Sequence, residues 1–262
     1  MKTSIERILL VTRLRDWVYL LGIAMLAIAK YRGVVSAELG ATILVFNGVY
    51  LCWGYVFNNL FDQGEDDPIK NPFLVLERAR ARWITFALTF LLIALAAWFG
   101  LLAETLSVMA LNVAYSVSPI RLKRWIVPSL AANGVFFGFV YYSAVKLIPT
   151  AELSIELPVC VFVFLLFLPL QYVHHLEHRE LARAKVRSFD RLVVACSFAA
   201  VIAWVFTNPV LAVIRLETLA YSVVCVVLVG DRRTSALVLR RIFRWISAAF
   251  GIAMLLKFGS WL

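Results

Sequence analysis

Charge is scarce in this sequence. Of its 262 residues only 16% are charged, while 63% are hydrophobic and the mean hydropathy is +0.87. An ordinary soluble domain has about 25% charged and about 45–50% apolar residues, so this composition excludes that class. The sequence predicts an integral membrane protein.

Cysteine patterns and flexible linkers are missing as well. The four cysteines each stand inside an apolar run, without a C-x-x-C or Cys/His spacing, which argues against a disulfide framework or a structural zinc site. The absence of an H-E-x-x-H sequence disfavours a zinc protease. Because no Gly/Ser-rich or Pro-rich linker divides the chain, we expect one domain over residues 1–262.

Long apolar runs fill most of the sequence. Nine of them are long enough, or nearly so, to cross a bilayer as helices. They cover about residues 16–31, 38–57, 83–101, 103–117, 127–148, 156–173, 189–207, 209–229 and 242–258. The first run follows a basic N-terminus without a small-residue cleavage site, so we expect a first span and not a removed signal peptide. The expected fold class is all-α, a polytopic bundle of about nine transmembrane helices.

The basic residues predict an orientation. With a cytoplasmic N-terminus, all but five of the 26 lysines and arginines lie in the inner segments. The five exceptions are Lys30, Arg32, Lys146, Arg215 and Lys257. The positive-inside rule therefore predicts a cytoplasmic N-terminus and a C-terminus on the opposite side. Topology thus explains the net charge of +10, so membrane lipid is an expected partner and nucleic acid is not.

A dense acidic segment, residues 58–67, follows the second apolar run. On a continued helix Asn58, Asp62 and Asp66 share one face at i, i+4 and i+8, at a spacing suited to a hard cation. Pro68 then breaks the helix and Lys70 follows. Carboxylates beside a lysine suit a phosphate bridged by Mg²⁺, which fills its remaining positions with water and phosphate oxygens. A solvated acidic loop between two spans is the alternative.

Two further polar segments end apolar runs. All three histidines follow the sixth run, where His174, Glu177 and His178 share a helical face that could ligate a transition metal, with Glu180 one turn beyond Glu177. Interfacial side chains at a helix end are the alternative. The fourth run ends in residues 115–124, with a tyrosine and a basic cluster that alone is typical of a positive-inside loop.

Together the three segments resemble the UbiA family of intramembrane prenyltransferases. That family has an N-D-x-x-D-x-x-x-D motif after its second helix, which Asn58, Asp62 and Asp66 match, with Asn59 in place of an aspartate. The family's Y-S-x-x-P-x-R-L-K segment after the fourth helix is matched by Tyr115, Ser116, Pro119, Arg121, Leu122 and Lys123. The third family motif, D-x-x-x-D or D-x-x-G-D, is replaced by the histidine-rich segment.

The resemblance implies Mg²⁺-dependent transfer of a prenyl group from a prenyl diphosphate to a small lipophilic acceptor. The positive-inside count puts this site near the cytoplasmic face. The resemblance also implies two Mg²⁺ ions, with Mn²⁺ as a possible substitute. The implied metal ligands are Asn58, Asp62, Asp66, Glu177, Glu180 and His178. The implied catalytic residues are Asp62, Asp66 and Tyr115, and the implied diphosphate-binding residues are Asn58, Lys70, Arg121 and Lys123. Aromatic faces at Phe136, Phe137, Tyr141 and Tyr142 could stabilise a carbocation or simply pack.

Two other functions stay open at this point. Intramembrane acids and histidines can form the proton or cation path of a transporter, although the acids here gather at the inner rim and no half of the chain repeats in the other. Asn59 and the altered third motif are also compatible with a UbiA-like protein that has lost catalysis. No residue indicates the acceptor or the prenyl chain length.

Overall fold

Helices dominate the computed structural model, which describes residues 12–62, 73, 78–178, 188–230 and 235–259. The N-terminal part consists of α2 (Leu14–Trp17), the 3-10 helix η1 (Val18–Leu20), α3 (Leu21–Lys30), α4 (Ala37–Phe61) and α5 (Arg78–Trp98). The middle consists of α6 (Leu102–Ser116), η3 (Leu122–Arg124), α7 (Ile126–Lys146) and α8 (Leu153–His178). The C-terminal part consists of α9 (Ser188–Thr207), η4 (Pro209–Ile214), α10 (Arg215–Gly230) and α11 (Ala236–Gly259).

Each of the nine expected spans corresponds to a helical segment, which confirms the all-α bundle. Within the described ranges, seven of these segments are long and apolar enough to cross a membrane. The other two are shorter: the first spans Val18–Lys30, and α6 has 15 residues. Apolar runs predicted the helices well because a spanning segment must satisfy its backbone hydrogen bonds internally.

The helix ends differ from the ends of the apolar runs. Both α4 and α8 continue beyond their runs, to Phe61 and His178, because helical hydrogen bonding does not require apolar side chains. The expectation that α4 continues through Asp66 is wrong, since Asp62 is its C-cap, with φ −98° and ψ 11°. Aspartate is a poor residue for a helix interior because its carboxylate competes for backbone groups. Asp66 itself lies outside the described residues.

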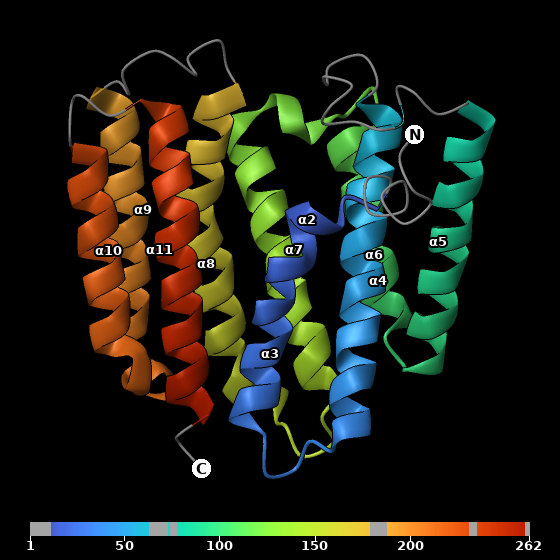
Figure 1. Ribbon diagram of the computed structural model, residues 1–262, viewed down its shortest axis with the longest axis horizontal. Coiled ribbons are helices and arrows are strands. Elements are labelled where there is room, and N and C mark those ends of the chain that lie inside the picture. Colours follow the sequence, from blue (N-terminus) through green and yellow to red (C-terminus); the bar gives the residue numbers. More distant parts are fainter. Residues whose placement is uncertain (1–11, 63–72, 74–77, 179–187, 231–234, 260–262) are drawn as a thin grey trace, which may run out of the picture.

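Successive long helices run up and down through the bundle (Figure 1). The central helix α7 packs against α3, α4, α6 and α8, while α9, α10 and α11 form the far side of the bundle. The C-terminal ends of α4, α6 and α8 therefore lie at one end, together with η3 and the N-terminal end of α7. This arrangement brings the three polar segments of the sequence to the same end of the molecule.

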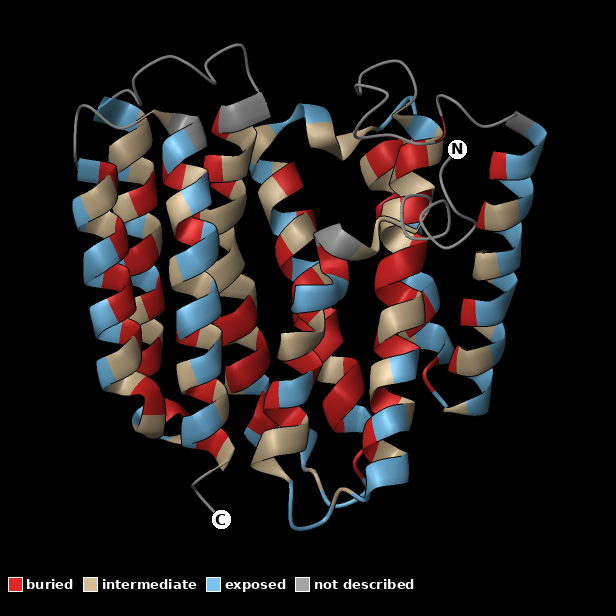
Figure 2. Ribbon diagram, in the orientation of Figure 1, coloured by how far each residue is buried: buried red, intermediate tan, exposed pale blue. Residues whose placement is uncertain are grey.

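The outer surface of the bundle carries many large apolar side chains, unlike the surface of a soluble protein. Large apolar side chains face outward, including Trp98, which is 84% exposed, and Trp245, which is 80% exposed. Polar side chains are enclosed between helices, among them Asn47, Ser129 and Glu156, each 0% exposed. In Figure 2 the exposed positions follow the outer faces of the outer helices. This pattern is expected of a multi-pass integral membrane protein, whose apolar surface contacts lipid.

Candidate active site

A tight turn after α6 directs a basic residue toward α4. Helix α6 ends at Ser116 because Pro119 lies just beyond it and cannot continue a helix. Arg121 then adopts a left-handed conformation, with φ 42°, and its N–H donates to the carbonyl oxygen of Val117 at 3.0 Å. The turn leads directly into η3, whose central residue is Lys123.

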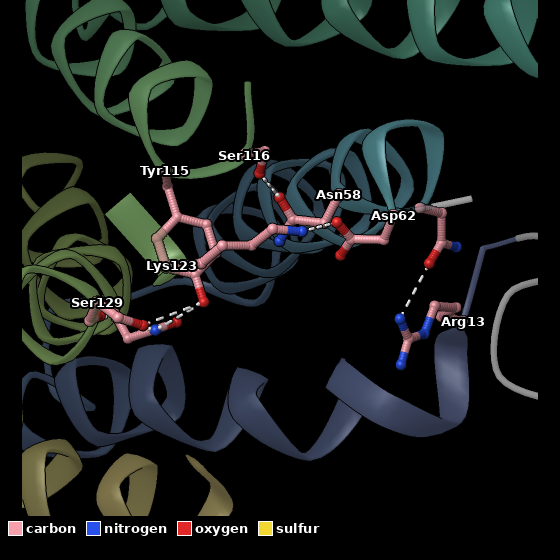
Figure 3. A network of polar contacts seen from close by, with 9 residues as sticks. Arg13, Asn58, Asp62, Tyr115, Ser116, Lys123 and Ser129 are labelled. Carbon is pink, nitrogen blue, oxygen red and sulfur yellow. Dashed lines mark hydrogen bonds and ion pairs between the residues drawn. The ribbon is translucent and has the colours of Figure 1, made fainter. Parts of the chain in front are cut away.

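The last residue of α6 and the central residue of η3 both contact the C-terminal end of α4. Ser116 Oγ donates to Asn58 Oδ1 at 2.5 Å, and Lys123 Nζ forms an ion pair with Asp62 Oδ1 (Figure 3). Both partners in the ion pair are partly enclosed, with side-chain exposures of 13% for Lys123 and 21% for Asp62. Two segments that are 58 residues apart in the sequence thus form one polar cluster.

Lys123 is a perturbed cation. Burial lowers the pKa of Lys123 to about 8, and the positive charge of the neighbouring Arg124 acts in the same direction. Both effects disfavour the charged ammonium, whereas the carboxylate of Asp62 favours it. Lys123 is therefore charged at pH 7 and loses its charge as the pH rises through about 8. A cation held in this environment gains from an additional anionic ligand.

A second set of contacts surrounds Tyr115, one residue before Ser116. The hydroxyl oxygen of Tyr115 accepts from Asn133 Nδ2 at 3.2 Å and from Ser129 Oγ at 3.4 Å. Ser129 Oγ also lies 2.7 Å from His175 Nε2. Because Asn133 and Ser129 belong to α7 and His175 to α8, this network links the second motif to the histidine-rich segment (Figure 3 shows its Tyr115 end).

Asn59, at the position where UbiA-family motifs usually have aspartate, is held by an arginine near the N-terminus. It is 0% exposed, and its Oδ1 accepts a hydrogen bond of 2.9 Å from Arg13 Nη1. The Arg13 guanidinium also lies 5.4 Å from the centre of the Tyr55 ring. In the described structure Asn59 thus attaches the residue before α2 to α4. A neutral amide can hold an arginine without adding a further charge to this enclosed position.

The structure brings together only some of the predicted site residues. It unites Asn58, Asp62, Tyr115 and Lys123, and it places Arg121 in the turn that carries Lys123. Helix α8 extends through Glu177 and His178, whose side chains are not described. Asp66, Lys70 and Glu180 lie outside the described residues. Among described side chains, no group of three or more His, Cys, Asp or Glu is placed to hold a metal ion.

Four residues of the cluster were not predicted: Arg13, Ser129, Asn133 and His175. Ser129 and Asn133 were nevertheless visible as polar residues four positions apart in an apolar helix, a pattern that in membranes favours a functional or pairing role. His175 was noted only as part of the histidine-rich segment. Its contact with Ser129 depends on how α7 packs against α8, which sequence spacing does not give.

The suggested aromatic residues lie in the middle and in the C-terminal half of α7 and have different partners. Phe136 packs edge-on against Tyr115, with ring centres 5.8 Å apart, and so lies beside the polar cluster. Phe137 instead stacks on Phe167. The hydroxyl groups of Tyr141 and Tyr142 donate to Glu156 and Glu104 toward the opposite end. Of the four aromatic residues, Phe136 is therefore the one whose ring packs against Tyr115 in the described structure.

The chain is thus a multi-pass helical membrane protein in which a carboxylate, an amide, an ammonium group and a phenol gather at one end of an apolar bundle. Two solved structures share this architecture. One, described as a digeranylgeranylglyceryl phosphate synthase in membranes, has a TM-score of 0.73 and 10% sequence identity, covering 98% of this chain and 99% of that chain. The other, a UbiA homolog from Archaeoglobus fulgidus bound to Cd²⁺, has a TM-score of 0.65 and 17% identity, covering 92% and 97%.

These similarities confirm, at the level of the fold, the resemblance that the motifs suggested. The chain has the fold of a UbiA homolog over nearly its whole length. No protein-family model matches the sequence, and no curated protein matches it either. With identities of 10% and 17%, the fold is retained although most residues differ.

Proposed function

We propose that this protein is an intramembrane prenyltransferase that transfers a prenyl group from a prenyl diphosphate to a small lipophilic acceptor. The contact between the end of α4 and the turn after α6 carries this proposal, because it combines Asn58 and Asp62 with Ser116 and Lys123. Such groups suit a diphosphate, while the apolar interior suits a prenyl tail. The fold shared with a UbiA homolog and a digeranylgeranylglyceryl phosphate synthase supports the same function.

The residues of the cluster fit the charges of this reaction. The bond between the allylic carbon and the diphosphate oxygen breaks, and its electron pair leaves with pyrophosphate. The acceptor then forms a bond to the allylic cation and loses a proton. Lys123 and Arg121 stabilise the negative charge that grows on the leaving group, Tyr115 donates a hydrogen bond to it, and the apolar walls exclude water from the cation.

The oxygen atoms at the end of α4 suit a hard divalent cation. Asn58 Oδ1 already accepts from Ser116 and keeps a second lone pair, and Asp62 provides a carboxylate that is 21% exposed. We propose that these two residues, with Asp66, hold one Mg²⁺, and that Glu177 with Glu180 or His178 holds a second. Bound Mg²⁺ would neutralise charge on the diphosphate, and Mn²⁺ could substitute for it.

The same proposal includes an orientation. The turn after α6 carries Arg121, Lys123 and Arg124, and the N-terminal half of α11 carries Arg240, Arg241 and Arg244. Both segments lie at the end of the bundle that holds the polar cluster. The positive-inside rule assigns this end to the cytoplasm, together with the N-terminus and the proposed site.

Purified protein in detergent, assayed for pyrophosphate release with a panel of prenyl diphosphates and acceptors, tests the function. We expect release that requires both an acceptor and added Mg²⁺ or Mn²⁺ and that stops in the presence of a chelator. Full activity without divalent metal would exclude the metal-dependent mechanism. Absence of release with every substrate pair, from protein that is folded and binds Mg²⁺, would favour a non-catalytic UbiA-like protein.

A further inference from the structure

We propose that Ser129, Asn133 and His175 are positioning residues that hold the hydroxyl oxygen of Tyr115 as an acceptor, so that its hydrogen is left to donate to the diphosphate. The inference rests on the proposed function, because it assigns a task to Tyr115 in that site. Neither α7 nor the α8 histidine belongs to the motif segment that carries Tyr115. The positioning set therefore comes from α7, which none of the three motif segments covers, and from the histidine-rich segment at the end of α8.

Asn133 has a fixed orientation. Its Nδ2 donates to the backbone carbonyl oxygen of Ser129 at 2.9 Å and to the hydroxyl oxygen of Tyr115 at 3.2 Å. A carbonyl oxygen can only accept, so the nitrogen of the amide must face Ser129 and not the oxygen. Both amide hydrogens are then engaged, and Tyr115 receives one of them. The helix α7 thus presents a donor to Tyr115 at a set position.

Ser129 is held from the other side by His175. The contact of 2.7 Å between Ser129 Oγ and His175 Nε2 is a short hydrogen bond, whereas the 3.4 Å to Tyr115 is long for two hydroxyl groups. Ser129 is 0% exposed and has one hydrogen to donate. With His175 donating from Nε2, the hydrogen of Ser129 is directed toward Tyr115. Substrate binding can shorten this contact, as is common for catalytic hydrogen bonds.

The hydroxyl group of Tyr115 has only its hydrogen left for a further hydrogen bond. A phenol has one hydrogen and can accept two hydrogen bonds, and both acceptor positions are taken by Asn133 and Ser129. Its ring is steadied by edge-on packing against Phe136. Because Ser116, the next residue, holds Asn58, the hydroxyl group belongs to the same end of α6 as the Lys123 and Asp62 pair. A diphosphate held by Lys123 is the acceptor that this arrangement suits.

A double-mutant cycle tests the positioning role. Affinity for inorganic pyrophosphate in the presence of Mg²⁺ is measured by calorimetry for wild type, Ser129→Ala, Tyr115→Phe and the double variant. We expect Ser129→Ala to weaken binding about fivefold when Tyr115 is present, as for the loss of one net hydrogen bond, and less than twofold in the Tyr115→Phe background. Equal weakening in both backgrounds, no weakening, or absence of binding by wild type would overturn the proposal.

His175 supplies a second route that does not depend on Ser129→Ala folding well. His175→Gln keeps a donor near the position of Nε2 and should bind pyrophosphate within twofold of wild type, whereas His175→Leu should match Ser129→Ala. If His175→Leu binds as wild type does, the proposal fails. Ser143→Ala is the matched control, since Ser143 is an equally buried serine on α7 that donates to Asn47 at 2.8 Å far from the cluster; it should leave binding unchanged.

The two proposals fail in different ways. Prenyl transfer by wild type is assayed separately from pyrophosphate binding. Coupled binding in the cycle without any prenyl transfer would reject the proposed function and leave the positioning set intact. Prenyl transfer with no coupling between Ser129 and Tyr115 would reject the positioning set alone.

Discussion

Four lysine–carboxylate pairs lie in the described part of the bundle. Two of them, Lys30–Glu156 at one end and Lys123–Asp62 at the other, differ in how completely the carboxylate is satisfied. At the end away from the proposed site, Glu156 is 0% exposed and accepts from Lys30 at 2.6 Å, Tyr31 at 2.7 Å and Tyr141 at 2.6 Å. At the other end Asp62 is 21% exposed and pairs with Lys123. An enclosed carboxylate with three donors fixes helices, whereas a partly exposed one can exchange its partner for a ligand.

The location of the two pairs supports this difference. Glu156 joins α8 to α3 through Lys30, to the residue after α3 through Tyr31, and to α7 through Tyr141. Asp62 lies at a helix end beside a segment of 3-10 helix. Enclosed pairing at Glu156 and more open pairing at Asp62 would let the proposed site change its contacts while the helices stay in place.

The largest expected effect is a loss of activity when the more exposed pair, Lys123–Asp62, is disrupted. Asp62→Ala removes a carboxylate from the proposed metal and diphosphate site, and we expect turnover to fall about a thousandfold or more, since such electrostatic stabilisation is worth several kcal/mol. Asp66→Ala should behave likewise. Thermal unfolding in detergent should match wild type within a few degrees. Wild-type turnover in either variant would refute the assignment of that carboxylate.

Disrupting the enclosed pair, Lys30–Glu156, should instead lower the stability and leave turnover nearly unchanged. Glu156→Ala leaves Lys30 without its carboxylate, and we expect a loss of about 3–5 kcal/mol in stability, the usual cost of breaking a buried pair. Turnover per folded molecule should stay within about threefold of wild type. The matched variant, Lys30→Met with Glu156→Leu, removes both charges and should recover most of the stability. A turnover defect as large as that of Asp62→Ala would end the distinction between the two pairs.

A smaller effect, on the affinity for pyrophosphate, is expected when the pH is changed. Since burial lowers the pKa of Lys123 to about 8, this cation is present below pH 8 and is lost above it. Affinity for pyrophosphate should therefore fall as the pH rises from 7 to 9, by up to about tenfold per pH unit above the pKa. In Lys123→Arg the guanidinium stays charged, so this fall should disappear. An identical pH profile in both proteins would show that another group titrates.

The sequence predicted the fold better than the site because the two depend on different information. Apolar runs identified every long helix, since a lipid-facing segment must be continuously apolar and internally hydrogen-bonded. The pairing of Asn58 with Ser116 could be anticipated only through the motif resemblance. The contact of Ser129 with His175 could not be anticipated from the sequence, because it depends on the rotation of α7 against α8. The end of α4 at Phe61 was missed because hydropathy does not report C-cap geometry.

The smallest expected effect concerns the histidine-rich end of α8. Its side chains at Glu177 and His178 are not described, so their proposed role in holding a second Mg²⁺ is open to a direct test. Glu177→Gln keeps the shape of the side chain but removes the charge of a hard-cation ligand. We expect it to raise the Mg²⁺ concentration needed for half-maximal activity a few-fold, and Glu180→Gln to act similarly.

A neutral imidazole is a poor ligand for Mg²⁺ and a good one for Zn²⁺. His178→Ala should therefore change the Mg²⁺ requirement less than Glu177→Gln does, unless the histidine binds metal directly, in which case Mn²⁺ or Zn²⁺ would be preferred by wild type. An unchanged metal requirement in all three variants would mean that a second ion is absent or bound elsewhere, and the proposed ligands at this end of α8 would be wrong.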